Sequence, residues 1–200
     1  MVGRDKFFGT LKQALAAYAF NICGVFAGTV VAFQLGLFSM APWVIAVYPG
    51  IISARGVIGG LLSGRLSTGL HVGTVRPRFL GNTRSFYLLF KAVVVLTLET
   101  SVAMSLVAVV FGAFLWGAKV TDLFTILGVI VATMTLALIV ISPLTMIVSF
   151  LSFKHGLDPD IILYPVESTI SDVLITLCYV SILSLYFLPS AFGLYIIVLL

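Results

Sequence analysis

Asp172 stands in a long apolar segment near the end of the chain, with hydroxyl residues close before it. The stretch reads HGLDPDIILYPVESTISDVLITLCYVSILSLYF. Thr169 and Ser168 precede Asp172 by about one helical turn, so a helix would carry their hydroxyls beside the carboxylate. Oxygen ligands without a nearby His, Cys or Met suit a hard cation such as Mg²⁺. The spacing therefore predicts a cation site built around Asp172.

A carboxylate in the middle of a membrane-spanning helix needs a water-filled path or a partner, because burial there costs at least ~2.5 kcal/mol. Arg55 and Glu99 lie at a similar depth in their own apolar segments. One hypothesis pairs Arg55 with Glu99 across two helices, and the other places Arg55 on a polar pore. Asp172 then has no basic partner at its depth, so a mobile cation is its natural complement. Two copies of the chain would bring two such carboxylates to a shared axis.

Other acidic residues are possible secondary sites. Asp158 and Asp160 flank Pro159 ahead of the apolar run, where they either cap a helix or attract cations to its mouth. Glu167 falls on a different helical face from Asp172 and could pair with another helix. The secondary acidic candidates are Glu99, Asp158, Asp160 and Glu167.

The second apolar segment, PWVIAVYPGIISARGVIGGLLSGRLSTGLHVG, is rich in glycine and serine and carries Pro-Gly within it. We expect an interrupted helix, because proline removes one backbone donor and frees a carbonyl. The small residues either form a packing face or line a polar route. The candidate pore-lining residues are Pro49, Gly50, Ser53, Arg55 and Gly56.

Composition identifies the class of protein to which these segments belong. Hydrophobic residues make up 61% of the 200 residues and charged residues only 9%, which is typical of an integral membrane protein. We expect an all-α fold and a single transmembrane domain over 1–200. Its five predicted helices span about 12–38, 42–70, 85–116, 121–152 and 160–187. The short apolar tail 188–200 is either a continuation beyond a kink or an interfacial piece.

The distribution of basic residues predicts the orientation. They gather in the N-terminal segment and in the second and fourth connections, at Arg4, Lys6, Lys12, Arg76, Arg78, Arg84 and Lys154. The positive-inside rule then places the N-terminus in the cytoplasm and the C-terminus outside, in a multi-pass protein of the cell membrane. The first helix reads as retained, since no small-residue cleavage site follows it. The net charge of +4 suits a lipid bilayer partner, and we expect no nucleic acid.

The remaining reactive residue types argue against an enzyme. His71 and His155 fall in connecting loops, so neither could activate a serine at membrane depth, and no run of spaced aspartates suggests phosphotransfer. Cys23 and Cys178 read as buried free thiols. Three classes stay open: a cation channel, a proton- or sodium-coupled cation carrier, and a non-transporting membrane scaffold.

Two stretches resemble a known family. GLDPDIILYPVESTISD resembles the G-x-D-P-x-x-x-x-x-P-x-x-x-T-x-x-D signature of the fifth membrane helix of MgtE magnesium channels. YPGIISARGVIGGLLSGRLSTGLHVG is similar to the second helix of their animal solute-carrier relatives, with Arg55-Gly56 where those carry Lys-Gly. The resemblance implies a homodimer whose axial pore, lined by the second and fifth helices, passes hydrated Mg²⁺ and related divalent cations. Asp172 would be the central cation ligand and Thr169 its neighbour on the pore wall.

Overall fold

The computed structural model describes residues 24–155 and 159–187, together with 11, 15 and 22; within 159–167 it describes the backbone only. Every regular element in this described part is a helix, which confirms the all-α prediction there. The helices are α2 (Val25–Phe33), α3 (Leu35–Phe38), α4 (Pro42–Val72), α5 (Arg84–Leu115), α6 (Asp122–Lys154) and α7 (Pro159–Phe187).

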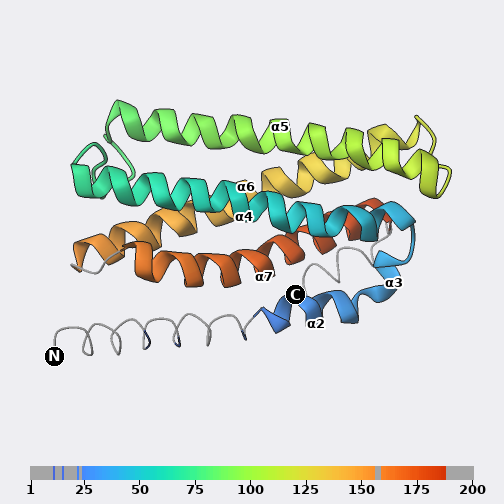
Figure 1. Cartoon of the computed structure of the whole chain (residues 1–200), viewed down its shortest axis with the longest axis horizontal. Helices are drawn as coiled ribbons and strands as arrows, with labels where there is room; N and C mark the ends of the chain where they lie inside the picture. The colour runs from blue at the N-terminus through green and yellow to red at the C-terminus, as the bar shows by residue number, and fades with distance from the viewer. Residues whose placement is uncertain (1–10, 12–14, 16–21, 23, 156–158, 188–200) are drawn as a thin grey trace.

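Four long helices lie side by side as a bundle in which each helix runs opposite to the one before it (Figure 1). The helix α4 contacts α5, α6 and α7, and α6 packs between α5 and α7. The short helices α2 and α3 lie against α7. This arrangement brings the middle of α4 next to the middle of α7, although the two are far apart in sequence.

Four predicted helices are confirmed to within a few residues, because local signals mark their ends. Pro42 occupies the first turn of α4, and Gly73 ends it with a left-handed backbone at φ 78°. The Thr83 side chain accepts a hydrogen bond from the Phe86 backbone N–H at the start of α5. The helix α7 begins at Pro159, as expected for proline in a first turn.

The predicted first helix over 12–38 is only partly described. Its described end is two helices, because α2 stops at Phe33 and α3 starts at Leu35. Most of the predicted helix before residue 24, and the 188–200 tail, lie outside the described residues. Among those that are described, four helices are long and apolar enough to cross a membrane: α4, α5, α6 and the 168–187 part of α7.

The expected interruption of the second helix is wrong. The helix α4 continues through Pro49 without a break. Proline removes one backbone hydrogen bond, yet the bonds on either side hold the helix, and α6 likewise continues through Pro143. A Cβ on Gly50 would lie 3.3 Å from the Met104 sulfur, so this small residue faces α5 rather than a break in the chain.

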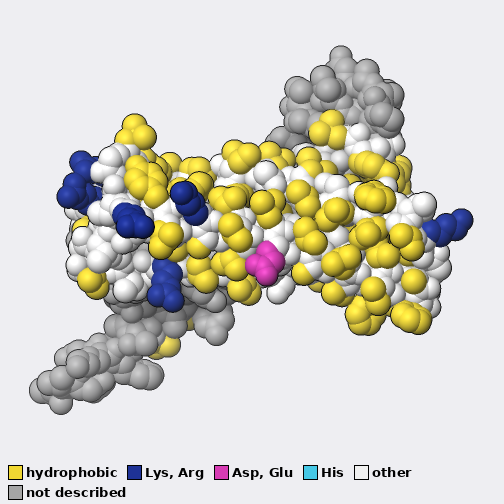
Figure 2. Space-filling model, turned by 90° about the horizontal axis from the view of Figure 1, so that it is seen from above, with side chains coloured by type: hydrophobic (Ala, Val, Ile, Leu, Met, Phe, Trp, Pro, Cys, Tyr) yellow, Lys and Arg dark blue, Asp and Glu magenta, His cyan; other side chains and the backbone are white. Residues whose placement is uncertain are grey.

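The surface of the bundle matches a membrane environment. Figure 2 shows hydrophobic side chains over the middle of one face and Lys and Arg side chains gathered at the end where α4 ends and α5 begins. The exposed basic residues there include Arg76, Arg78, Arg84 and Lys91. His71 and His155 are exposed, as predicted, but His71 lies in the last turn of α4 rather than in a loop. Each ring nitrogen Nδ1 lies near the backbone carbonyl oxygen of the residue four positions earlier. The orientation across the membrane stays a prediction.

Candidate functional site

A cavity of about 110 Å³ lies between the middle of α4 and the middle of α7. Its walls are glycine backbone and polar side chains, in contrast to the apolar grooves elsewhere on the bundle. Among the residues whose side chains are described, four from α4 and three from α7 line it: Arg55, Gly56, Gly59, Gly60, Ser168, Ser171 and Asp172. Four of these seven were predicted site residues, so the structure brings together two parts of the chain that the sequence singled out separately.

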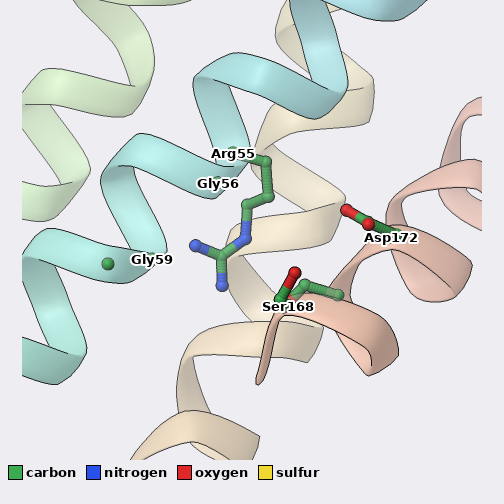
Figure 3. Close-up of a pocket in the computed structure, with 7 residues that line it drawn as sticks. Arg55, Gly56, Gly59, Ser168 and Asp172 are labelled. Atoms are coloured by element: carbon green, nitrogen blue, oxygen red, sulfur yellow. The ribbon is translucent and has the colours of Figure 1, made fainter. Parts of the chain in front are cut away.

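The charged groups of the cavity come from opposite helices. Figure 3 shows the Arg55 side chain leaving α4 toward the space beside Ser168, while the Asp172 carboxylate leaves α7 toward α4. Arg55 is only 3% exposed, Asp172 is half-buried and Ser168 is exposed. The cavity therefore holds a fixed positive charge and a carboxylate within one small polar space.

The hydroxyl neighbours of Asp172 differ in part from the predicted pair. Ser168 lines the cavity as expected, but Thr169 is 4% exposed and is not among the lining residues. Ser171, which the sequence did not single out, lines the cavity instead. Ser168, Ser171 and Asp172 follow i, i+3, i+4 spacing, so they share one face of α7, and Thr169 is turned into the bundle.

Arg55 and Glu99 are not paired. Arg55 is buried between α4 and its neighbours, whereas Glu99 lies on the exposed face of α5, and no ion pair joins these two described residues. Both were correctly placed near the middle of their helices. The two side chains nevertheless point in different directions, one into the bundle and one out of it. Equal depth does not bring them together, because packing decides how each helix is rotated about its own axis. Arg55 instead lines the cavity with Asp172, and the second hypothesis, that it lies on a pore, stays a prediction.

The predicted pore-lining residues of α4 fall mostly on one side of the helix. Pro49, Ser53 and Gly56 are exposed, and Gly60 and Gly64 continue the same face at helical spacing. A Cβ added to Gly56, Gly60 or Gly64 would meet nothing within 4 Å. We define these five exposed residues, Pro49, Ser53, Gly56, Gly60 and Gly64, as the open face of α4.

The cavity residues that sequence reasoning missed are Gly59, Gly60 and Ser171. The signal that could have found them is spacing, because Gly59 and Gly60 follow Gly56 at i+3 and i+4, and Ser171 follows Ser168 at i+3. Of the secondary acidic candidates, Asp158 and the side chains of Asp160 and Glu167 lie outside the described residues.

The chemistry available at the cavity is that of a weak oxygen site. One carboxylate and two serine hydroxyls face a space large enough for water. Within the described part of the chain, no group of three or more His, Cys, Asp or Glu side chains could hold a metal ion. The described part of one chain therefore offers a divalent cation at this cavity the single negative charge of Asp172, with water filling the remaining coordination positions.

Comparison with known proteins agrees with this chemistry. No curated protein and no solved structure matches the chain. A family model described as MgtE, divalent cation transporter, matches residues 48–182, well over half of the chain. The matched range holds every residue that lines the cavity between α4 and α7. With its apolar helices and its polar cavity, the chain belongs to the MgtE family of divalent cation transporters.

Proposed function

We propose that this protein carries Mg²⁺ across the cell membrane through a pore on the axis of a homodimer, lined by α4 and α7 of both copies. The observation that carries the proposal is the cavity in which Asp172, Ser168 and Ser171 of α7 meet the glycines of α4. Membership of a divalent cation transporter family supports the choice of cargo.

The open face of α4 supports the position of the pore. Small residues at Ser53, Gly56 and Gly60 leave backbone atoms accessible beside the cavity, where a carbonyl or hydroxyl oxygen can contact the water shell of a passing ion. A membrane helix rarely exposes such a face to lipid without reason, since close backbone approach favours another helix or water.

The charge of the site supports a dimer. A single Asp172 is a weak ligand, and a second copy related by a two-fold axis would place a second Asp172 opposite the first. Both copies would then lie parallel in the membrane, with N-termini in the cytoplasm and C-termini outside. In such a dimer the cation site would have two carboxylates although each chain supplies only its Asp172.

The all-oxygen surroundings support Mg²⁺ among divalent cations. Mg²⁺ loses its water reluctantly and is usually held by one or two carboxylates while it keeps several waters. Two Asp172 carboxylates on a water-filled axis provide this kind of site. The Arg55-Gly56 sequence in α4 supports the further proposal that this chain is closer to the animal solute-carrier relatives of MgtE, which carry Lys-Gly at this place.

The test is Mg²⁺ uptake into liposomes that contain the purified protein, measured with and without imposed proton and sodium gradients. We expect uptake driven by the Mg²⁺ gradient alone. Uptake that requires a proton or sodium gradient would identify a coupled carrier instead. Liposomes that take up no more Mg²⁺ than empty ones under any gradient would contradict transport and favour a scaffold.

A further inference from the structure

A chain of two hydrogen bonds joins α4 to the turn of α7 that carries Asp172. The Tyr48 hydroxyl on α4 lies 2.8 Å from Thr176 Oγ1 on α7. Thr176 in turn donates to the backbone carbonyl oxygen of Asp172 at 2.6 Å. Because the threonine hydroxyl has one proton and gives it to that carbonyl, Tyr48 must be the donor in the first bond. The bonds therefore run in one direction, from Tyr48 to the backbone of Asp172.

A second hydrogen bond joins the same two helices, with its donor on α7 and its acceptor on α4. The Tyr179 hydroxyl on α7 donates to the Val44 carbonyl oxygen on α4 at 2.8 Å. The rings of Tyr48 and Tyr179 are stacked, with centroids 5.8 Å apart and planes 18° apart. Each helix thus gives one tyrosine hydroxyl to the other, about one turn apart. Two such bonds fix both the axial register and the rotation of α7 relative to α4.

The bonded hydroxyls are satisfied in only one arrangement of the helices. Thr176 and Tyr179 are each 0% exposed, so their polar groups have no water as an alternative partner. Rotation of α7 by one residue would turn Asp172 by about 100° away from the cavity and would leave these hydroxyls unpaired. The register in which the hydroxyls are bonded is therefore the register in which Asp172 faces Gly56 and Gly59.

We propose that Tyr48 is a positioning residue for the cation site: through Thr176 it holds α7 in the rotation that aims the Asp172 carboxylate into the cavity. The proposal rests on the function proposed above. Tyr48 is not among the described residues that line the cavity, so it acts on Asp172 through the backbone. Its loss should change the affinity for Mg²⁺ more than the maximal rate.

The experiment measures the apparent KM and the maximal rate of Mg²⁺ uptake for Tyr48→Phe, Thr176→Val, the double variant and Thr176→Ser. Each of the first two removes one hydroxyl while keeping the ring or the branched shape, and we expect KM to rise about threefold to tenfold. The double variant should be no worse than the worse single variant, since both break one chain of bonds. Thr176→Ser keeps the hydroxyl and should restore the wild-type KM.

A second tyrosine–threonine pair provides the matched control. Tyr186 on α7 and Thr125 on α6 have hydroxyl oxygens 2.9 Å apart, away from the cavity. Tyr186→Phe removes a tyrosine–threonine bond from the same helix, although an exposed one, and should leave KM unchanged. A KM rise equal to that of Tyr48→Phe would show a general loss of packing and overturn the proposal.

Two results separate this inference from the proposed function. If wild-type protein takes up Mg²⁺ and Tyr48→Phe and Thr176→Val both keep the wild-type KM, the positioning role is wrong and the transport function stands. If the wild-type protein takes up no Mg²⁺, the proposed function fails and the positioning role fails with it. If Tyr48→Phe cannot be purified folded, Thr176→Val and its serine counterpart decide the question.

Discussion

Arg55 of α4 and Asp172 of α7 line the same cavity, yet no ion pair joins these two described residues. A guanidinium and a carboxylate that share a small polar space without direct contact leave room for water between them. The positive charge lowers the attraction of the site for any cation, while the carboxylate raises it. This balance of charges leads to the first two predictions.

Asp172→Asn is expected to reduce Mg²⁺ uptake by about tenfold or more, because it removes the carboxylate that the described residues contribute to the cavity. The fold should survive, since the asparagine has the same shape and Asp172 takes part in no ion pair with a described residue. Uptake into liposomes and elution as a folded species measure the two effects. Glu99→Gln is the control, because Glu99 is exposed on α5 outside the cavity. Wild-type uptake by Asp172→Asn would contradict the assignment of the central ligand.

Arg55→Gln is expected to lower the apparent KM for Mg²⁺ by about threefold to tenfold, because it removes a fixed like charge from beside the ion. Arg55→Lys keeps the charge and should change KM little. Both variants need a measurement of thermal stability, since Arg55 is 3% exposed and truncation disturbs its packing. If Arg55→Gln raised KM instead, the guanidinium would serve the site by holding its shape rather than by repelling the ion.

Adding Glu99→Gln to Arg55→Ala is expected to give no recovery of stability. Recovery would require that the two charges neutralise each other, and the structure places Arg55 inside the bundle and Glu99 on the exposed face of α5. Thermal unfolding in detergent of the single and double variants measures the coupling between the two positions. A double variant clearly more stable than Arg55→Ala would show that the residues interact after all.

Gly60→Ala and Gly69→Ala are expected to have opposite effects on the stability of the folded chain. A Cβ at Gly60 meets nothing within 4 Å, so alanine should be neutral or stabilise the helix by up to about 1 kcal/mol. A Cβ at Gly69 would lie 2.7 Å from the Val75 Cγ2 atom, which should cost about 1–3 kcal/mol.

If the open face of α4 contacts the second copy or the pore, larger residues at Gly60 should impair dimerisation or uptake while the chain stays folded. Cross-linking in membranes and Mg²⁺ uptake by Gly60→Leu test this. A Gly60→Leu variant with wild-type dimerisation and uptake would show that the open face of α4 contacts lipid only.

Ser39→Cys is expected to react with a membrane-impermeant thiol reagent added from outside the cell. Ser39 is exposed after α3, at the end of the bundle that the positive-inside rule places outside. Ser85→Cys, exposed at the opposite end of the bundle at the start of α5, should react only after the cells are opened. Both are made in a background in which Cys23 and Cys178 are replaced by serine. The reverse pattern of labelling would invert the predicted orientation.

The sequence by itself determined the number and limits of the four long helices that the structure describes. Apolar runs of this length must form helices in hydrocarbon, because every backbone N–H and C=O has to be bonded within the segment. Local signals then set the ends, such as Pro42 before α4 and Gly73 after it. Depth followed from counting residues along each helix, which is how Arg55, Glu99 and Asp172 were all placed near the middle.

Only the tertiary structure decided which way each helix faces. These helices are apolar on nearly all sides, so hydrophobic periodicity carries little information about rotation. The choice of Ser168 and Ser171 over Thr169 in the cavity, and of Asp172 over Glu99 as the charged neighbour of Arg55, therefore came from packing. The bonds from Tyr48 to Thr176 and from Tyr179 to Val44 fix that rotation, and they join residues 128 and 135 positions apart. Pairing over such distances depends on how whole helices pack together, which no local pattern of residues records.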